Sequence, residues 1–480
     1  MLTTTPEIWP DKARKIMIEK GIDVETLQEM FGEIVFPWQD EYNTARVYFS
    51  LRIQQRPLFV VRPHDVTEIE TILNYVHEKK LTIRIMNGRH SSQMVSSEVL
   101  VDMSYFMKKE VIGDVLFSGA GNTQGSLNEF LFNELQREIY SHFGNFTHPR
   151  ISSSAFPGGS AATVGSVGIS TAGGLGTLNR THGLTVDHIL SFTITVPPTS
   201  QENSKTIIAN KNENCDLFWA LRGGQGNNFG IISEITYDVI EVPSVISYHI
   251  AWPWKDAEKV LKRYDETSND RPNNFNEDIR LYYRKGRGIE LSGIYIMKEN
   301  ETFEQAKKAI EKEYKCLKGV TKIEDPIKYS DLYRKKATAR VYYNFSIVQP
   351  IFSNDVSAEK AAELIEKAEQ EKFETPVSIS FTLMKGEISK VGRKDTAFYP
   401  RKKKFFVDIA TFWNEIKDSK SVEQWTEKAV STYLRPHTYL YVGFPTISNP
   451  KIYFGGNTKR LKEIKAFYDP LNILTSTGTL

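Results

Sequence analysis

Two glycine-rich stretches carry the clearest chemical signals in this sequence. One is Asn87-Gly88-Arg89-His90-Ser91-Ser92 and the other spans residues 156–183. Because glycine lets backbone N–H groups approach phosphate oxygens that a Cβ would keep away, both are candidate loops for a phosphorylated ligand. The standard nucleotide motifs are missing, since the sequence has no GxGxxG after a strand and no GxxxxGK[ST]. It also lacks HExxH and GxSxG, which disfavours metalloenzymes and hydrolases.

A β-α-β unit is predicted to carry the first of these loops. Residues 58–61 are a short apolar run, and Asp65 can cap a helix with Glu68 at the third position. The buried face of this helix is marked by Ile69, Ile72, Leu73 and Val76. Alternation over residues 81–85 then predicts a strand that stops at Asn87-Gly88. The polar loop therefore follows directly from a strand end.

The composition is that of a globular protein and excludes several classes. The chain has 480 residues with 61 basic and 59 acidic side chains, so its formal charge of +2 argues against a general nucleic-acid binder. Cys215 and Cys316 lie in no CxxC or Cys/His cluster, so we expect buried free thiols and no metal site. Residues 1–20 hold no secretion signal, and no apolar run reaches the roughly 18 residues of a membrane span. We expect a cytoplasmic protein.

The length predicts two or three units, at roughly 100 to 200 residues per domain. Further strands expected at 99–102, 115–118, 191–196 and 230–239 make the first half mixed α/β. From residue 242, amphipathic helices at 302–317 and 357–372 alternate with aromatic strands at 279–283, 289–297, 341–348 and 377–384, which predicts an α+β second unit. The final segment holds a predicted strand at 439–444 and a helix at 458–468.

Several motifs in a fixed order resemble those of one known family. They are the stretches 87–92, 156–183, 183–188, 216–232, 386–401 and 453–472. At these distances they resemble the FAD-linked oxidases of the vanillyl-alcohol oxidase and p-cresol methylhydroxylase superfamily, most closely the berberine-bridge-enzyme-like branch, over about residues 56–474. The resemblance implies an α+β, two-domain fold of the p-cresol methylhydroxylase type. Residues 1–241 would form the FAD-binding domain, completed by residues 438–480, with a substrate domain inserted at 242–437.

His90 receives the sharpest role from this resemblance. A histidine in a turn is ordinarily just a hydrogen-bonding loop residue. The resemblance implies that its imidazole is joined to the 8α-methyl of FAD, a bond that holds the flavin permanently and raises its reduction potential. Many relatives add a second bond through a cysteine before a TVG motif, but here Ala161 and Ala162 precede Thr163-Val164-Gly165. We therefore expect FAD to be covalent through His90 only.

The resemblance also implies the remaining cofactor contacts. They are Asn87, Gly88, Arg89, Ser91, Ser92, Gly165, Gly173, Gly174 and Gly176 around the pyrophosphate and ring, Gly183, Asp187, Gly230 and Ile232 at the adenosine half, and Tyr453 and Asn457 near the pyrimidine edge. The alternative is a set of turn glycines with a capping aspartate at Asp187 and a helix N-cap at Asn457.

Catalysis requires a group that takes a proton as hydride leaves the substrate carbon. The resemblance points to Tyr441, because the family's Y-x-N-Y pattern appears here as Tyr441-Val-Gly-Phe444. A tyrosine pKa is ordinarily about 10, so Tyr441 needs a cation such as Lys385, Arg340 or Arg401. The glutamate position of many relatives falls near Thr382, which makes Glu387 a substitute candidate. A packed strand residue is the alternative for Tyr441.

Together these features predict an FAD-dependent oxidase. It would oxidise an alcohol or C–N centre of a small molecule by hydride transfer to flavin N5 and be reoxidised by dioxygen, giving hydrogen peroxide. The alternatives are a dehydrogenase with another acceptor and a flavin-binding protein that no longer turns over, which the missing second tyrosine, glutamate and cysteine link suggest. A nicotinamide dehydrogenase lacks its GxGxxG motif. We expect no metal, nucleic-acid or membrane partner, and the sequence predicts no oligomeric state.

Overall fold

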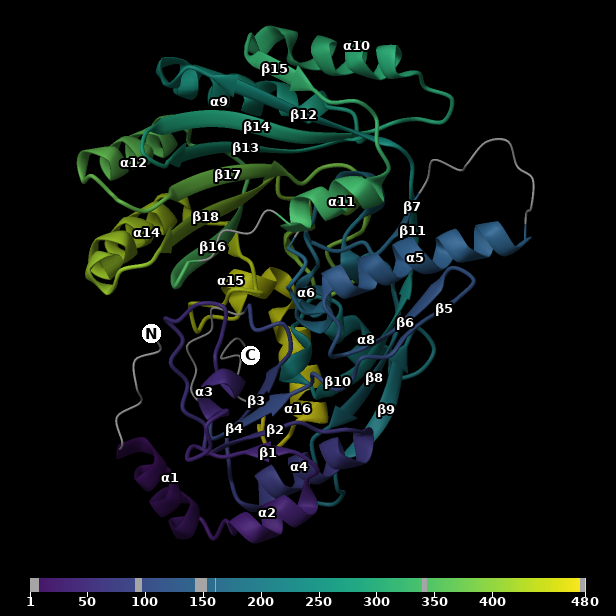
Figure 1. Ribbon diagram of the computed structural model, residues 1–480, viewed down its shortest axis with the longest axis vertical. Coiled ribbons are helices and arrows are strands. Elements are labelled where there is room, and N and C mark those ends of the chain that lie inside the picture. Colours follow the sequence, from purple (N-terminus) through teal and green to yellow (C-terminus); the bar gives the residue numbers. More distant parts are fainter. Residues whose placement is uncertain (1–7, 91–96, 143–152, 160, 339–342, 475–479) are drawn as a thin grey trace.

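A computed structural model gives the fold of the chain (Figure 1). It describes residues 8–90, 97–142, 153–159, 161–338, 343–474 and 480. Two predicted cofactor contacts, Ser91 and Ser92, and one predicted partner of Tyr441, Arg340, lie outside the described residues.

The β-α-β unit predicted after residue 56 forms a four-stranded sheet with one connecting helix. The strands are β1 (Ile34–Val35), β2 (Phe59–Val61), β3 (Ile83–Met86) and β4 (Val99–Asp102), in the spatial order β1-β2-β4-β3. Helix α4 (Val66–Glu78) connects β2 to β3, and its predicted cap is confirmed because the Asp65 carboxylate accepts the Glu68 amide at 3.0 Å. Since β3 ends at Met86, the loop that begins at Asn87 leaves the end of this strand.

A second sheet combines strands from before and after the glycine-rich stretch. Its order is β5 (Lys109–Ile112), β6 (Val115–Gly119), β10 (Ile231–Asp238), β8 (Ile189–Val196) and β9 (Lys205–Asn210), and beside it β7 (Ser153–Ala155) pairs with β11 (Ile240–Val242). The glycine-rich stretch itself contains the short helices α6 (Ser166–Ala172) and α7 (Asn179–His182). It is therefore ordered structure, as its regularly placed apolar residues predict.

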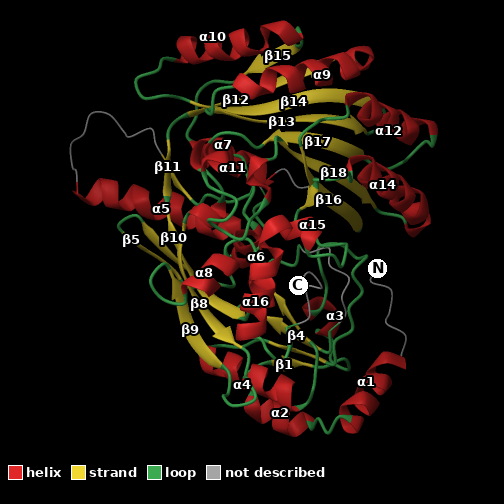
Figure 2. Ribbon diagram, turned by 180° about the vertical axis from the view of Figure 1, so that it is seen from behind, coloured by secondary structure: helices red, strands yellow, loops and turns green. Residues whose placement is uncertain are grey.

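An eight-stranded antiparallel sheet makes up most of the second half of the chain. Its order is β15 (Val320–Ile323), β12 (Val245–Trp252), β14 (Arg287–Ile296), β13 (Phe275–Tyr283), β17 (Val377–Leu383), β18 (Phe405–Trp413), β16 (Phe345–Ser353) and β19 (Tyr439–Leu440). Helices α9 (Ala257–Thr267), α12 (Ala358–Gln370) and α14 (Ser419–Tyr433) cover one face, and the other face turns toward α6 and α15 (Lys451–Phe454) (Figure 2). We call this second face the inner face.

The strand register decides which side chains reach the inner face. Ile279, Phe381 and Val407 form one fully buried row, and the Phe381 ring lies 6.0 Å from that of Tyr433 in α14, so this row faces the helices. Because side chains alternate across a strand, the adjacent rows face the other way. These rows are Asp278–Thr382–Phe406 and Arg280–Ser380–Asp408. The inner face is therefore polar and charged at its centre.

Nine further helices are described. They are α1 (Ile8–Glu19), α2 (Val24–Met30), α3 (Tyr42–Ala45), α5 (Gln124–His142), α8 (Cys215–Leu221), α10 (Phe303–Tyr314), α11 (Tyr329–Thr338), α13 (Glu387–Lys390) and α16 (Thr458–Tyr468). The strand predicted over 439–444 ends at Leu440, because the Phe444 amide turns back to the Tyr441 carbonyl at 3.2 Å. The domain limits at 241/242 and 437/438 stay predictions, and β19 itself pairs with β16 of the large sheet.

The C-terminal helix α16 is fixed to the first half of the chain. It packs on α8. The buried Lys465 ammonium donates to the carbonyls of Asn228 and Leu474, both at 3.0 Å, and to the Asp469 carboxylate at 2.8 Å. One cation therefore ties the end of α16 to Asn228, which precedes the large sheet in the sequence, and to Leu474, which follows it.

Three further expectations can be compared with the described residues. Cys215 and Cys316 are both exposed, so the expectation of buried thiols is wrong. Cys215 opens α8, where its thiol donates to the Lys211 carbonyl at 3.2 Å and stays at the surface. Among the described residues, no group of three or more His, Cys, Asp and Glu side chains is arranged to hold a metal ion. None of the helices described has the length and apolar character that crossing a bilayer requires.

Candidate functional site

His90 lies where the loop after β3 meets the start of α6. Its Nε2 is 2.8 Å from the hydroxyl oxygen of Thr163, and its ring stacks on Phe49 with the ring centroids 4.6 Å apart. One contact at the ring edge and one at the ring face thus fix the imidazole. The structure brings together the two glycine-rich stretches that the sequence analysis assigned to one ligand.

Glycines allow this close approach. A Cβ on Gly88 would overlap the backbone of Gly165 and the Thr163 carbonyl, and a Cβ on Gly165 would overlap the side chain of Asn87. Both polar atoms of the Asn87 amide are buried and have no hydrogen-bond partner among the described residues. Because an unpaired buried amide is costly, a polar ligand at this junction is its natural partner. The residues present therefore fit a phosphorylated flavin such as FAD.

Arg89 differs from its neighbours in the loop. It adopts a φ of +60°, which is uncommon for a residue with a side chain. Its guanidinium donates to the Thr44 carbonyl at 2.9 Å and to the Asp102 carboxylate at 3.0 Å. Arg89 thus ties the loop to β4, and its contact with the cofactor stays a prediction.

The glycines of the second stretch are required by packing within the protein. Gly173 and Gly174 have φ values of +128° and +79°, and a Cβ at these positions would overlap Phe398 and Thr185, respectively. The other predicted positions are also explained by the protein itself. A Cβ on Gly176 would overlap the Gly158 carbonyl, and a Cβ on Gly230 would overlap the Thr195 carbonyl. Gly183 has a φ of +93°, and Ile232 is buried in β10. Their cofactor contacts stay predictions.

Asp187 acts as a structural anchor in this structure. Its carboxylate accepts the Leu184 amide at 3.0 Å and forms a two-point ion pair with Arg401, at 2.9 Å for Nη1 and 2.5 Å for Nη2. Arg401 is fully buried and also donates to the Thr396 hydroxyl at 2.8 Å. The glycine-rich stretch is thereby joined to the segment before β18.

The two C-terminal candidates hold backbone segments. The Tyr453 hydroxyl donates to the Ile447 carbonyl at 3.0 Å. The Asn457 amide donates to the carbonyls of Arg393, Thr396 and Ala397 at 2.8, 3.2 and 3.3 Å. Asn457 does precede α16, but its side chain makes no capping bond there.

Tyr441 lies between the inner face and the glycine-rich stretch. Its amide donates to the Pro350 carbonyl at 3.1 Å, and its ring lies 5.8 Å from the Phe406 ring. Burial raises the pKa of Tyr441, and a hydrogen bond with the Gly174 backbone only partly opposes this shift. Tyr441 thus connects the two halves of the site as a neutral phenol.

The other residues proposed to act with Tyr441 have different partners. Arg401 is engaged by Asp187, and the Lys385 ammonium donates to the Asn269 side chain at 2.8 Å. Glu387 pairs with Lys390 at 2.6 Å at the start of α13. Within the described residues, no hydrogen bond or ion pair joins any of these groups to Tyr441.

Two carboxylates on the inner face are not singled out by the sequence analysis. The Thr382 hydroxyl, near which the family resemblance places a glutamate, donates to Asp278 at 3.4 Å. Asp408 is the one charged residue in the mostly apolar strand FFVDIATFW. A charged residue inside such a strand is rarely buried without a reason, and this is the signal in the sequence that marks it.

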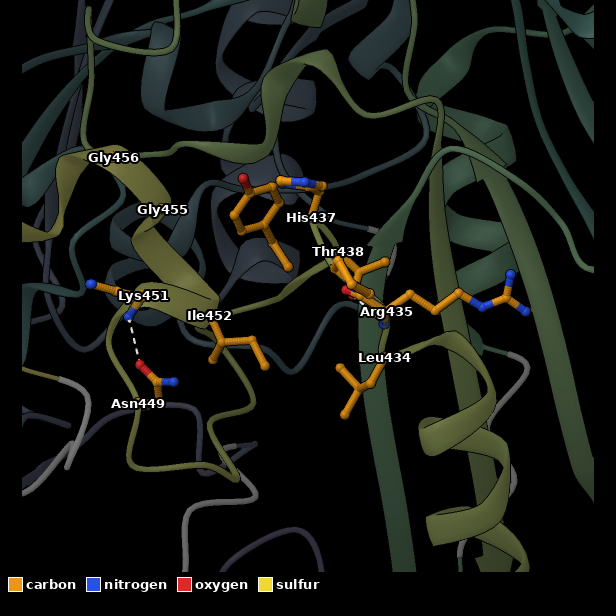
Figure 3. A pocket seen from close by; sticks show the side chains of 11 residues that line it. Leu434, Arg435, His437, Thr438, Asn449, Lys451, Ile452, Gly455 and Gly456 are labelled. Atoms are coloured by element: carbon orange, nitrogen blue, oxygen red, sulfur yellow. Dashed lines mark hydrogen bonds between the residues drawn. The ribbon is translucent and has the colours of Figure 1, made fainter.

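An open cavity of about 530 Å³ lies beside β19 and α15 (Figure 3). It is lined by residues 434–439, 449, 451, 452, 455 and 456, and includes none of the predicted site residues. In Figure 3 the Arg435 side chain points away from Lys451. The cavity is thus separate from the His90 junction.

Comparisons with known proteins agree with this geometry. Residues 440–477 match the family model described as "Berberine and berberine like". The chain is 24% identical to an uncharacterized FAD-linked oxidoreductase, YgaK, of Bacillus subtilis, with 93% of this chain and 96% of that protein covered. It is 26% identical to the chitooligosaccharide oxidase of Gibberella zeae, with 92% and 90% covered.

Among solved structures, the carbohydrate oxidase from Microdochium nivale superposes with a TM-score of 0.79 at 18% identity, covering 94% of this chain and 97% of that one. This likeness confirms the predicted α+β fold of the FAD-binding, p-cresol methylhydroxylase type. With the family match and the relatives, it confirms the resemblance drawn from the sequence motifs. The chain is similar to the berberine-bridge-enzyme-like FAD-linked oxidases and is an FAD-dependent oxidoreductase.

Proposed function

We propose that this enzyme oxidises an alcohol or C–N centre of a small molecule, with FAD covalently bound through His90 and with dioxygen as the electron acceptor. When bound, FAD supplies a two-electron acceptor for the hydride that leaves the substrate carbon. The observation that carries the proposal is the junction at His90, where a fixed imidazole adjoins a buried amide that lacks a partner among the described residues.

The chain's own residues divide the work of holding the cofactor. Asn87 offers a donor and an acceptor, and Gly88 and Gly165 leave room for a ligand beside the backbone. His90 is oriented by Thr163 and Phe49 before any bond forms. Such preorganisation favours attachment at one ring position, since the imidazole need not be ordered during the reaction.

The relatives suggest which substrates to test first. Two of them are named as oxidases of chitooligosaccharides and xylooligosaccharides. The inner face carries hydroxyl, carboxylate and guanidinium groups from Thr382, Asp278 and Arg280, which suit a ligand rich in hydroxyls. A hydroxyl-bearing small molecule, either a short saccharide or an aromatic alcohol, is therefore our first substrate class.

Acid precipitation tests the covalent link. Wild-type protein is expected to give a yellow pellet and a colourless supernatant, whereas His90→Ala should release all its flavin into the supernatant. The matched control is His249→Ala, since this partly exposed histidine of β12 contacts Glu290 of β14, away from the junction; its pellet should stay yellow. A yellow supernatant from the wild type would remove the covalent bond while leaving the oxidoreductase assignment.

The second half-reaction needs a separate assay. Xylobiose, chitobiose and benzyl alcohol are added to the flavin-loaded enzyme without oxygen, and bleaching of the flavin absorbance is followed. Readmitting air should restore the colour and release hydrogen peroxide in equal amount. Bleaching that air does not reverse, but an artificial acceptor does, would identify a dehydrogenase. Absence of bleaching with every candidate would favour a flavin-binding protein without turnover.

A further inference from the structure

Asp408 lies at the centre of the inner face, where one of its carboxylate oxygens is buried. Its neighbour on β17 is Ser380, and beyond that on β13 is Arg280. Its neighbour on β16 is Pro350, which has no N–H to offer. The Oδ1 atom of Asp408 is buried and has no hydrogen-bond partner among the described residues.

The charges around Asp408 come from several elements. Asp278 on β13 adds negative charge, and Arg280 on the same strand opposes it, with the Arg280 guanidinium 3.5 Å from Asp278. Glu290 on β14 lies opposite Arg280, and Lys336 of α11 interacts with Asp278. Burial first and the charge of Asp278 second raise the pKa of Asp408 to about 6. The carboxyl can therefore exchange a proton near neutral pH.

Asp408 also lies close to the residue that links the inner face to the glycine-rich stretch. The Tyr441 amide binds the carbonyl of Pro350, which is the residue paired with Asp408. The Tyr441 ring contacts Phe406, two residues before Asp408 on the same face of β18. Since Tyr441 reaches the Gly174 backbone, Asp408 faces the space between the sheet and the predicted flavin loop.

We propose that Asp408 is the catalytic base of this enzyme and that Asp278 is a positioning residue that tunes it; this inference rests on the proposed oxidation of an alcohol or amine. The Asp408 carboxylate takes the place of the carboxylate that many relatives carry at Thr382. Tyr441 is less suited to the role, because it is a buried phenol with a raised pKa and no neighbouring cation among the described residues.

The step balances for an alcohol substrate. The C–H bond breaks and its electron pair leaves as hydride to the flavin, the two-electron oxidant of the proposed function. The O–H bond breaks, its proton goes to an Asp408 oxygen, and its electron pair becomes the second bond of the carbonyl group. Asp408 then returns the proton to solvent, which reaches this face because the Arg280 side chain is 47% exposed.

Asp408→Asn tests the chemical role, because it keeps the shape and removes the basic oxygen. The rate of anaerobic flavin bleaching by the substrate is expected to fall by about 100-fold or more, as for loss of a general base. In the wild type this rate should decline as pH falls through about 6, and in Asp278→Asn the decline should occur at lower pH. Asp331→Asn is the control. Asp331 is an exposed carboxylate on α11, so its replacement should leave the bleaching rate and its pH dependence unchanged. An Asp408→Asn enzyme that bleaches at the wild-type rate would overturn the proposal.

A second readout requires no substrate. The folded-state pKa of Asp408 is raised above the ordinary 3.8, so the wild type loses stability as pH rises from about 4 to about 6. Asp408→Asn lacks this loss, so its melting temperature should exceed that of the wild type at pH 8 and match it at pH 4. Equal melting temperatures at both pH values would show that Asp408 is not a perturbed carboxyl and would sink the proposal.

The two readouts separate this inference from the proposed function. If the wild type bleaches and Asp408→Asn bleaches equally fast, the oxidase stands and the base assignment falls. If no alcohol or amine bleaches the wild type, the proposed function fails, and the base assignment fails with it even when the melting temperatures reveal a perturbed carboxyl. Normal flavin content in Asp408→Asn, measured by absorbance, confirms that the variant differs in chemistry and not in cofactor loading.

Discussion

Replacing Gly88 with alanine is expected to abolish flavin binding and to lower the free energy of unfolding by about 3 kcal/mol. A Cβ at this position would overlap the backbone nitrogen and Cα of Gly165 and the Thr163 carbonyl. These are backbone atoms at the start of α6, so no side chain can rotate away to relieve the overlap. The two loops would have to separate, which would pull Thr163 away from His90.

Gly168→Ala is the matched control for this prediction. Gly168 lies inside α6, three residues after Gly165, and no atom outside its own helix lies within 4 Å of an added Cβ. Alanine also favours the helix over glycine by roughly 0.5–1 kcal/mol, so this variant should bind flavin and melt slightly higher. Thermal melts and the flavin absorbance of the two purified variants provide the comparison. A flavin-replete Gly88→Ala protein would contradict the role of close backbone approach.

Removing the positive charge of Arg271, which lies just before β13, is expected to be strongly destabilising. Arg271 and Glu277 are ion-paired with both side chains fully buried, and Glu277 also accepts the hydroxyls of Tyr248, Tyr264 and Tyr314. Burial opposes the Arg271 charge, but Glu277, Tyr264 and Glu313 together more than offset it and raise the Arg271 pKa. Arg271→Met would leave a buried carboxylate without its cation, at a cost of about 3–5 kcal/mol.

A double-mutant cycle measured by urea denaturation tests this coupling. Arg271→Met and Glu277→Gln should each be strongly destabilising, and the double variant should be much more stable than the sum of the two costs predicts, because neither charge of the fully buried pair remains. Arg263→Met is the control on the same side of the sheet. Its pair with Glu266 is exposed at both ends and screened by solvent, so the loss of stability should be small. Additive costs in the cycle would show that the buried pair is not coupled.

The sequence predicts the local parts of this fold well. Three features depend on neighbours within a few positions, which the sequence displays directly. They are the Asp65 cap, the strand that stops before Asn87 and the regular structure within residues 156–183. The His90 candidate could be placed in a loop for the same reason. Its contact with Thr163 spans 73 positions, and no local pattern predicts it.

The parts that escaped prediction depend on pairing between distant strands. Asp278 and Thr382 are 104 positions apart, and their contact is set by the register of β13 with β17. The strand around Asp408 is apolar on both faces, so its periodicity does not reveal which face Asp408 shares with Tyr441. Asn457 precedes a helix as predicted, yet its amide binds carbonyls about 60 positions earlier, which no local pattern encodes.

The bond from Lys465 to the Asn228 carbonyl has a consequence for how the protein is made. The two residues are 237 positions apart. At a synthesis rate of about 5–20 residues per second, α16 leaves the ribosome roughly 10 to 50 seconds after residue 228. During that interval the surface of α8 that α16 covers has no partner from its own chain. Closure of the first half is therefore a late event of high contact order, which follows translation of the whole large sheet.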